Sequence, residues 1–431
     1  MKTAINFIYI IAGILISPVV LYRMARHKRY RKGWSERLGK IRRKYPKKAC
    51  IWIHAVSVGE VNATKTLIAG LRDRFPGFEI VLSTTTDTGF ARANSLYGDK
   101  MMVFYFPFDF SFTMERAFEN IQPAICLLME LEVWPNFVRT AADKNIPVVL
   151  VNGRITKQSS SKYKLIKPLA KKMFAELTLL LTQSEEYSRR FEEIGCDREK
   201  IMVTSSLKYD TAQVTDKVQG SDALAEELKL TNERLWVAGG TGNGEEKIIL
   251  DVFSKLKKAI DFANVRLVIV PRKPERFDEV AKLIEKTQFK LVRYSTIKQG
   301  TCTTGIDKAS VILGDTMGDL RKFYSLADIV FVGRSLVPMG GSDMMEAAAL
   351  SKCTIFGPYT YNFNQTVGVL LGSNAAIRVK NSEELLIMLK KCLREPQYAE
   401  RLGQNGRRTI IRNQGATAAS VEQIGKILAE T

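Results

Sequence analysis

Short apolar runs alternate along this chain with stretches in which apolar side chains recur at helical spacing. Runs rich in Val, Ile and Leu that are followed by helical patterns predict parallel strands joined by helices. The first predicted strands span residues 49–57, 79–83, 124–129 and 147–151. A second set, after a polar stretch, spans residues 235–238, 265–270, 290–292, 311–313, 329–332 and 354–356. The pattern predicts an α/β protein with two doubly wound, Rossmann-like domains that face a cleft at the carboxyl ends of their strands.

The N-terminus follows a different pattern, because residues 3–22 contain no charged side chain. About twenty such residues are needed to cross the hydrocarbon core of a bilayer. A cleaved signal peptide is the alternative, but Lys2 is the only charge before the apolar run, and the sequence Arg-Met-Ala-Arg-His at 23–27 offers no small-residue cleavage site. Pro18 leaves open a kinked or re-entrant segment. We therefore expect an N-terminal membrane anchor, of the signal-anchor type, at residues 1–22.

The segment after this anchor, residues 23–48, is strongly basic. It carries thirteen Lys and Arg and one acid, Glu36, and so supplies more than half of the net charge of +20. Positive charge after an apolar span predicts that the downstream chain stays cytoplasmic, and it attracts anionic lipid. A second basic run, residues 157–172, has six Lys and no acid, which suits an acidic lipid or sugar phosphate. Nucleic acid is the runner-up interpretation, but no nucleic-acid-binding motif accompanies the charge.

The expected domain organisation follows from these patterns. After the anchor and the basic segment, we expect an N-terminal domain at 49–210, a linker at 211–232 and a C-terminal domain at 233–431. The final helices of that last domain, within residues 382–427, are expected to pack back over the junction.

Cysteine and histidine usage narrows the chemistry. The six cysteines are scattered without a C-x-x-C pair, which is typical of a reducing compartment. The two histidines, His27 and His54, are too few for a zinc cluster or an H-E-x-x-H motif. We therefore expect no metal, and we expect acid–base chemistry to be performed by a carboxylate.

The first half of the chain contains three candidate site segments at predicted strand ends. In His-Ala-Val-Ser-Val-Gly-Glu (54–60), Gly59 allows a tight turn and Glu60 begins the next helix; the alternative role of Glu60 is to stabilise the helix N-terminus. Residues 83–89, rich in hydroxyls, suit an anion or a sugar hydroxyl, or simply cap a helix. In Met-Glu-Leu-Glu-Val-Trp-Pro-Asn (129–136), two acids beside a Trp suit a sugar, with a structural turn as the alternative.

The second half contains two glycine-rich segments. Residues 239–244 lack the dinucleotide spacing and the P-loop Lys, so they do not indicate NAD or ATP binding. In Gly-Gly-Ser-Asp-Met-Met-Glu (340–346), Asp343 and Glu346 have the spacing of a capping box. The preceding glycines would expose backbone N–H groups to a phosphate, and Glu346 would accept hydrogen bonds from ribose hydroxyls. Pure helix capping is the alternative.

Together these segments resemble one family, the bacterial 3-deoxy-D-manno-octulosonic acid (Kdo) transferases of lipopolysaccharide biosynthesis, which belong to glycosyltransferase family 30 and have the GT-B fold. The anchor and basic segment are also what this family shows. The resemblance rests on residues 52–60, Pro107, Asp109, 129–136, 152–154, 207–210, 271–276, 314–319, 357–358 and 362–363.

The resemblance implies an inverting transferase of EC class 2.4.99 that moves Kdo from CMP-Kdo to a glucosamine hydroxyl of the lipid A precursor, lipid IVA. It implies no metal or other cofactor, anionic membrane lipids as partners, and a location on the cytoplasmic face of the bacterial inner membrane. Glu60 matches the catalytic general base. The implied donor-binding residues are Lys208, Gly240, Thr241, Arg272, Met317, Gly318, Gly340, Gly341, Ser342, Asp343 and Glu346. Those expected to bind the acceptor or a sugar are Ser57, Gly59, Thr86, Glu130, Glu132 and Arg154.

The chain departs from the family pattern mainly on the donor side. The family usually has Gly-Gly-His-Asn at 340–343, Ser-Thr-His near 241–243, Arg-His-Pro at 272–274, and Gly in place of Arg334. Histidine is thus missing at three places, and Asp343 would repel a phosphate unless it turns away to cap the helix. These departures leave open a transferase of another nucleotide sugar to a lipid acceptor. A membrane-tethered binding protein without catalysis is a further alternative, against which the intact Glu60 segment argues.

Overall fold

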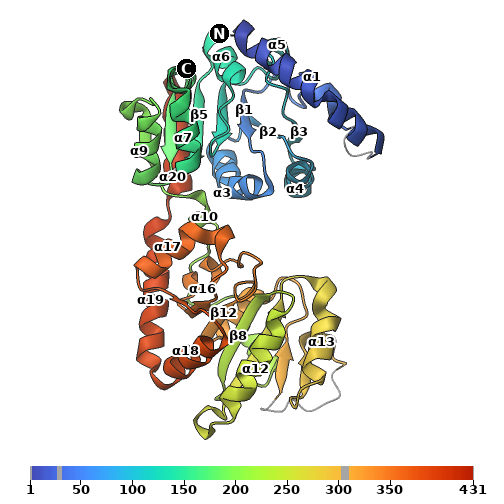
Figure 1. Cartoon of the computed structure of the whole chain (residues 1–431), viewed down its shortest axis with the longest axis vertical. Helices are drawn as coiled ribbons and strands as arrows, with labels where there is room; N and C mark the ends of the chain where they lie inside the picture. Colours follow the sequence, from blue (N-terminus) through green and yellow to red (C-terminus); the bar gives the residue numbers. More distant parts are fainter. Residues whose placement is uncertain (1, 27–31, 302–309, 431) are drawn as a thin grey trace. The chain divides into compact units, whose positions relative to one another are not determined.

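The computed structural model describes residues 2–26, 32–301 and 310–430. The chain divides into two compact units, shown in Figure 1. The first unit comprises Met1–Thr211 and Asn413–Thr431, and the second comprises Ala212–Arg412. Each unit contains one seven-stranded parallel sheet within the described residues. This confirms the predicted pair of parallel α/β domains.

The sheet of the first unit has the strand order β3-β2-β1-β4-β5-β6-β7. The chain moves outward from β1 to β3 and then returns to β4 on the other side of β1. A topological switch point therefore lies between β1 and β4, and ligands of open α/β sheets bind at such points, beyond the carboxyl ends of the strands. The strands are β1 Cys50–His54, β2 Glu79–Thr84, β3 Met102–Tyr105, β4 Ile125–Met129, β5 Val148–Gly153, β6 Leu179–Thr182 and β7 Ile201–Val203.

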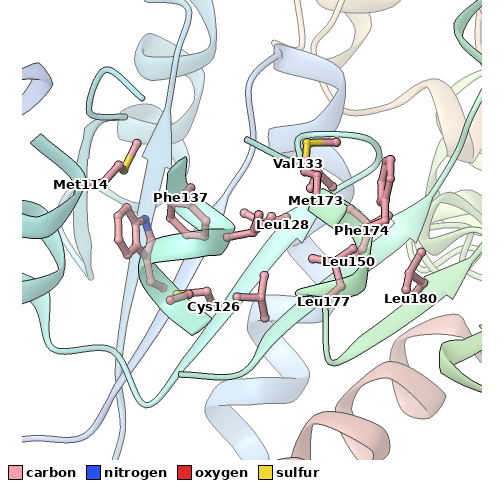
Figure 2. Packing of buried hydrophobic residues seen from close by; sticks show 14 of the residues in the cluster. Met114, Cys126, Leu128, Val133, Phe137, Leu150, Met173, Phe174, Leu177 and Leu180 are labelled. Carbon is pink, nitrogen blue, oxygen red and sulfur yellow. The ribbon is translucent and has the colours of Figure 1, made fainter. Parts of the chain in front are cut away.

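The helices of the first unit cover both faces of this sheet, and every residue of β1, β2, β4 and β5 is therefore buried. Figure 2 shows the cluster on one face, where Cys126, Leu128 and Leu150 of the sheet meet Phe137 and Phe174. The opposite face packs against α3, α4 and α20. The helices are α1 Lys2–Arg26, α2 Trp34–Arg37, α3 Val58–Arg74, α4 Asp87–Tyr97, α5 Ser111–Ile121, α6 Pro135–Asp143, α7 Lys157–Leu165, α8 Lys167–Ala175, α9 Glu185–Glu193, α10 Leu207–Asp210 and α20 Ala416–Glu430.

The second unit repeats this architecture with the strand order β10-β11-β9-β8-β12-β13-β14, so its switch point lies between β8 and β12. The strands are β8 Arg234–Thr241, β9 Val265–Pro271, β10 Leu291–Arg293, β11 Val311–Leu313, β12 Ile329–Val332, β13 Cys353–Phe356 and β14 Ile377–Arg378. The helices are α11 Ser221–Glu227, α12 Glu245–Lys257, α13 Phe277–Glu285, α14 Tyr294–Lys298, α15 Leu320–Leu326, α16 Met345–Ala349, α17 Asn364–Gly372, α18 Ser382–Arg394 and α19 Pro396–Asn413.

The domain boundaries differ from the expected ones in two places. Residues 211–232 are not a simple linker, because they contain α11, whose Leu224 is buried. The chain after Arg412 belongs to the first unit rather than to the second. There α20 packs on α3, and Thr417 Oγ1 lies 2.8 Å from Thr66 Oγ1. Apolar periodicity identifies a helix but does not say which sheet it covers.

The predicted membrane anchor is not confirmed. Residues 2–26 form the single helix α1, with Pro18 inside it. Among the residues that the structure describes, no helix meets the length and hydropathy required to cross a membrane. The helix is tied to the first unit near its N-terminus, where Asn6 Nδ2 donates to Ser111 Oγ at 2.7 Å and the Tyr9 hydroxyl donates to Asp109 at 3.0 Å.

The basic segment is only partly a solvated surface. Arg43 is buried, and its guanidinium pairs with the Glu79 carboxylate at 2.8 Å and donates to the Ile121 carbonyl. The Arg37 guanidinium donates to the Thr85 carbonyl and stacks on the Tyr105 ring. These two cations stabilise the fold and are therefore not available to lipid. Residues 27–31 of this segment lie outside the described residues.

Candidate active site

The loops that follow β1 and β4 flank the switch point of the first sheet, and those that follow β8 and β12 flank that of the second. Most of the predicted site residues lie on these four loops. Glu60 follows β1, and Glu130 and Glu132 follow β4. In the second unit, Gly240 and Thr241 end β8, and the segment 340–343 follows β12.

Glu60 lies in the first turn of α3, which Ser57 caps. The Ser57 hydroxyl accepts the Glu60 N–H at 3.3 Å and donates to Glu60 Oε1 at 2.8 Å, while the Val56 N–H donates to Oε2 at 2.9 Å. The residue is 8% exposed. Burial raises the pKa of Glu60 against the opposing effect of these hydrogen bonds, and the charge of Glu130 raises it further. Glu60 therefore takes part in a helix cap, as the alternative interpretation proposed, and is also an oriented carboxylate of increased basicity.

Two further carboxylates lie in electrostatic contact with Glu60. Burial and the charge of Glu60 raise the pKa of Glu132 to about 7, although Trp134 Nε1 donates to its carboxylate at 3.2 Å. Glu130 adopts a left-handed backbone conformation with φ 55°. The charge of Glu130 therefore acts on Glu60, and the charge of Glu60 acts on Glu132. The structure thus brings together Glu60, Glu130 and Glu132, while their roles in catalysis and in acceptor binding stay predictions.

Asp109 holds the Trp-Pro-Asn segment of this site in place. Its carboxylate accepts the N–H groups of Asn136 and Phe137, at 3.0 and 2.8 Å, at the start of α6. It also accepts the Tyr9 hydroxyl of α1. Burial raises the pKa of Asp109 to about 7. Asp109 is therefore a positioning residue that fixes the segment carrying Glu130 and Glu132.

The expectation that Gly59 allows a tight turn is wrong. Gly59 lies inside α3, and a Cβ placed there would make only an ordinary contact, 3.7 Å from Ser57 Oγ. The glycine in close contact is Gly89, where a Cβ would lie 2.6 Å from the Val56 carbonyl oxygen. Thr86 caps α4 by accepting the Gly89 N–H and donates to the same Val56 carbonyl at 2.8 Å. Thr86 therefore supports the turn that carries Glu60, which agrees with the helix-capping alternative.

The two predicted cations of this unit lie on different elements. Arg154 follows β5, and its N–H donates to the Glu130 carbonyl at 3.3 Å. Its Nε is buried and has no hydrogen-bond partner among residues 2–26, 32–301 and 310–430. Lys208 lies on α10. Lys208 therefore belongs to the first unit, whereas the other predicted donor-binding residues belong to the second.

In the second unit, a buried carboxylate that the sequence analysis did not identify joins the two loops at the switch point. Glu245 is fully buried at the start of α12, next to the loop after β8. One of its oxygens accepts the N–H groups of Gly242 and Arg334, and the other accepts those of Ser335 and Leu336. Burial raises the pKa of Glu245, and the four hydrogen bonds oppose that shift. In the sequence, the one indication of this role was a Glu directly after Gly244.

Ser342 makes a second connection between these loops. Its hydroxyl donates to the Gly240 carbonyl at 2.8 Å. Gly240 has φ 67°, and a Cβ there would lie 2.8 Å from Ser342 Oγ, so glycine is required at this position. The Thr241 hydroxyl is buried and has no hydrogen-bond partner in the part of the chain that the structure describes. Gly240, Thr241 and Ser342 therefore lie together, and their role in donor binding stays a prediction.

The segment 340–346 differs from a capping box. Gly340 and Gly341 both have positive φ, 86° and 85°. The helix α16 begins only at Met345, and Asp343 Oδ1 accepts the Met345 N–H at 2.8 Å rather than that of Glu346. Burial, and next the charge of Asp343, raise the pKa of Glu346 to about 7, against the charges of Arg321 and Arg272. Asp343 thus forms a tight turn before the helix.

The remaining predicted donor residues lie on neighbouring loops of the second sheet. Arg272 directly follows β9 and is exposed, and its N–H donates to the Thr241 carbonyl at 3.1 Å. Met317 is 72% exposed, and Gly318 has φ 89°. Asp319 anchors this turn by ion pairs with Lys298 and Lys322 at 3.0 and 2.8 Å.

Comparison with known proteins identifies the family. The model of the 3-deoxy-D-manno-octulosonic-acid transferase (kdotransferase) family matches residues 32–211. The 3-deoxy-D-manno-octulosonic acid transferase of Haemophilus influenzae is 32% identical over 95% of this chain and 96% of its own length. That of Bordetella pertussis is 29% identical over 88% of this chain and 87% of its own length.

Solved structures agree on the fold. A glycosyltransferase from Rickettsia africae is similar with a TM-score of 0.55 and 15% identity, covering 89% of this chain and all of that one. The two parallel-sheet domains resemble those of GT-B glycosyltransferases. The family match and the relatives of similar length show that this chain belongs to the family of 3-deoxy-D-manno-octulosonic acid transferases.

Proposed function

We propose that this protein transfers Kdo from CMP-Kdo to a glucosamine hydroxyl of lipid IVA, with inversion at the anomeric carbon. The observation that carries this proposal is the arrangement of Glu60 in a chain of this family. Its carboxylate is held through both oxygens at the switch point of the first sheet, and burial raises its pKa. A general base is most effective when its pKa is near the working pH.

Glu60 acts as the general base in this mechanism. It accepts the proton of the attacking hydroxyl as the hydroxyl oxygen bonds to the anomeric carbon of Kdo. The bond from that carbon to the phosphate oxygen breaks at the same time, and CMP leaves with the electron pair. Attack from the face opposite the leaving group inverts the configuration. The neighbouring Glu132, with a pKa of about 7, binds a proton near neutral pH and so limits the negative charge around Glu60.

The second unit binds the donor. The loops after β8 and β12 offer backbone groups around Gly240, Thr241 and Gly340, and Glu245 and Ser342 hold these loops together. Arg272 and Glu346 lie close enough for their charges to interact. We assign Glu346 to the ribose hydroxyls, Met317 and Gly318 to the base, and Arg154 and Lys208 to the anionic groups of donor or acceptor.

The protein works at the cytoplasmic face of the inner membrane in this proposal, because its acceptor is a lipid. Residues 23–48 supply positive charge, although Arg37 and Arg43 are engaged within the fold. Several side chains of α1 are apolar and exposed, including Phe7, Ile14 and Leu15. Anionic vesicles should therefore bind the protein in a salt-sensitive manner.

The test is a transfer assay with purified full-length protein, CMP-Kdo and lipid IVA, followed by mass spectrometry of the lipid product. The expected product is heavier than the acceptor by one or more Kdo residues. Parallel reactions with other nucleotide sugars test the alternative donor. Transfer from another nucleotide sugar but not from CMP-Kdo, or no transfer from any donor, would refute the proposal.

A further inference from the structure

Arg334 occupies an unusual backbone position at the switch point of the second sheet. It follows β12 by two residues, and its φ is 59°, in the left-handed region that glycine adopts freely and other residues avoid. Its N–H donates to Glu245 Oε2 at 2.5 Å, which fixes this conformation. A non-glycine residue held in a strained conformation at a site indicates a function for its side chain.

The Arg334 side chain lies over the glycine loop that follows β8. A Cβ on Gly242 would be 2.9 Å from Arg334 Cγ and 2.5 Å from Met339 Sδ, so any larger residue at 242 would displace the arginine. The absence of a side chain at Gly242 therefore provides the space that Arg334 occupies. Both residues are held by the same carboxylate, because Glu245 also accepts the Gly242 N–H.

Within the described residues, the Arg334 guanidinium lacks the carboxylate partner that several other arginines of the second unit have. Arg234, Arg276 and Arg293 of the second unit each pair with a carboxylate at 2.9 Å or less. In the part of the chain that the structure describes, the Arg334 guanidinium has no carboxylate within ion-pair distance, and it donates only to the Met339 carbonyl, at 3.2 Å. Because a guanidinium has five N–H donors, most of them remain available for an anionic ligand.

We propose that Arg334 is a donor-binding residue whose guanidinium holds an anionic group of the nucleotide sugar, a role that rests on the proposed function. CMP-Kdo carries two such groups, the phosphate and the sugar carboxylate, and planar guanidinium geometry suits either oxyanion. The Arg334 side chain is half-buried and lies at the carboxyl edge of the second sheet. Nucleotides bind at this edge in open α/β folds.

Arg334→Gly separates this role from a structural one. Glycine relieves the backbone strain and keeps the N–H bond to Glu245, so the melting temperature should stay unchanged or rise. The KM for CMP-Kdo should nevertheless rise about tenfold or more, since a hydrogen-bonded charge pair is lost. Arg334→Lys should recover part of this loss. A folded Arg334→Gly protein whose KM for CMP-Kdo and affinity for CMP stay within twofold of wild type would overturn the proposal.

Calorimetric titrations with CMP and with cytidine identify the anionic group. Weaker CMP binding in Arg334→Gly, with cytidine binding unchanged, assigns the guanidinium to the phosphate. Unchanged CMP binding with a raised KM for CMP-Kdo assigns it to the sugar carboxylate. If the wild-type protein transfers no Kdo, the proposed function fails, and the CMP titration alone then decides whether Arg334 binds an anion.

Two variants of the same unit serve as matched controls. Ser351 also has a left-handed backbone, with φ 57°, so Ser351→Gly relieves a similar strain without removing a cation. Arg394 is exposed and pairs with Asp261 at 3.1 Å, so Arg394→Gln removes a positive charge away from the glycine loops. Both controls should keep the wild-type KM for CMP-Kdo. An equal rise of KM in either control would assign the Arg334→Gly effect to backbone relaxation or net charge and so overturn the proposal.

Discussion

Glu60 and Glu245 occupy corresponding places in the two units. Each lies in the first turn of the helix that follows a strand beside the switch point, α3 after β1 and α12 after β8. The Glu60 carboxylate accepts two hydrogen bonds and the residue is 8% exposed, whereas that of Glu245 accepts four backbone N–H groups and the residue is fully buried. In the first unit the Glu60 carboxylate can therefore still accept a proton, whereas in the second unit the Glu245 carboxylate holds two loops together.

The largest effect on catalysis should come from Glu60→Gln. The amide cannot accept the proton of the attacking hydroxyl, so kcat should fall by about 10²–10⁴-fold. The amide oxygen can still accept the Val56 N–H, and stability should therefore change by less than about 1 kcal/mol. Single-turnover transfer assays and thermal denaturation measure the two quantities. Near-normal turnover in this variant would remove Glu60 from the mechanism.

Glu245→Ala should show the opposite pattern, with stability affected most. It leaves four N–H groups without their acceptor, two of them in buried hydrogen bonds, and the loss of each buried bond costs about 1–3 kcal/mol. Glu245→Gln keeps one acceptor oxygen and should lose less. Chemical denaturation measures the difference, with the exposed Asp251→Ala on the same helix as a control. If Glu60→Gln destabilises the protein more than Glu245→Ala, the contrast between the two carboxylates is wrong.

The sequence was sufficient for the strand pattern and for the family, but less so for the details of the site. Apolar runs identified β1 and β4 and the loops that follow them, because buried parallel strands are nearly continuous in hydrophobicity. The turn at Glu60 was attributed to Gly59, whereas the close contact is made by Gly89, 30 residues further along the chain. Glu245 was missed for the same physical reason, since three of its four N–H donors are about 90 residues away in sequence. Packing between distant loops leaves no local pattern.

The charge of Glu130 next to Glu60 should appear in the pH dependence. Glu60 must be unprotonated to act as a base, so kcat/KM should rise with pH as Glu60 loses its proton, at a pH above the ordinary range of a glutamate because burial and the charge of Glu130 raise the pKa of Glu60. In Glu130→Gln the repulsion between the two charges is removed, which lowers the pKa of Glu60 and shifts this rise to lower pH. The exposed Glu193→Gln, whose carboxylate pairs with Lys164, should leave the profile unchanged. A shift to higher pH in Glu130→Gln would contradict this interaction.

The smallest effect is expected from Asp343→Asn. This variant tests whether the Asp343 carboxylate, like that of Glu245, has a structural role in the second unit. Asp343 Oδ1 accepts the Met345 N–H at 2.8 Å, and an Asn oxygen can accept the same bond. Stability should therefore change by less than about 0.5 kcal/mol, whereas Asp343→Ala should cost about 0.5–2 kcal/mol. Calorimetric titration should show nearly unchanged affinity for CMP in Asp343→Asn. If the affinity instead increases several-fold, the carboxylate faces the phosphate, and the loop before α16 is part of the binding surface rather than a structural turn.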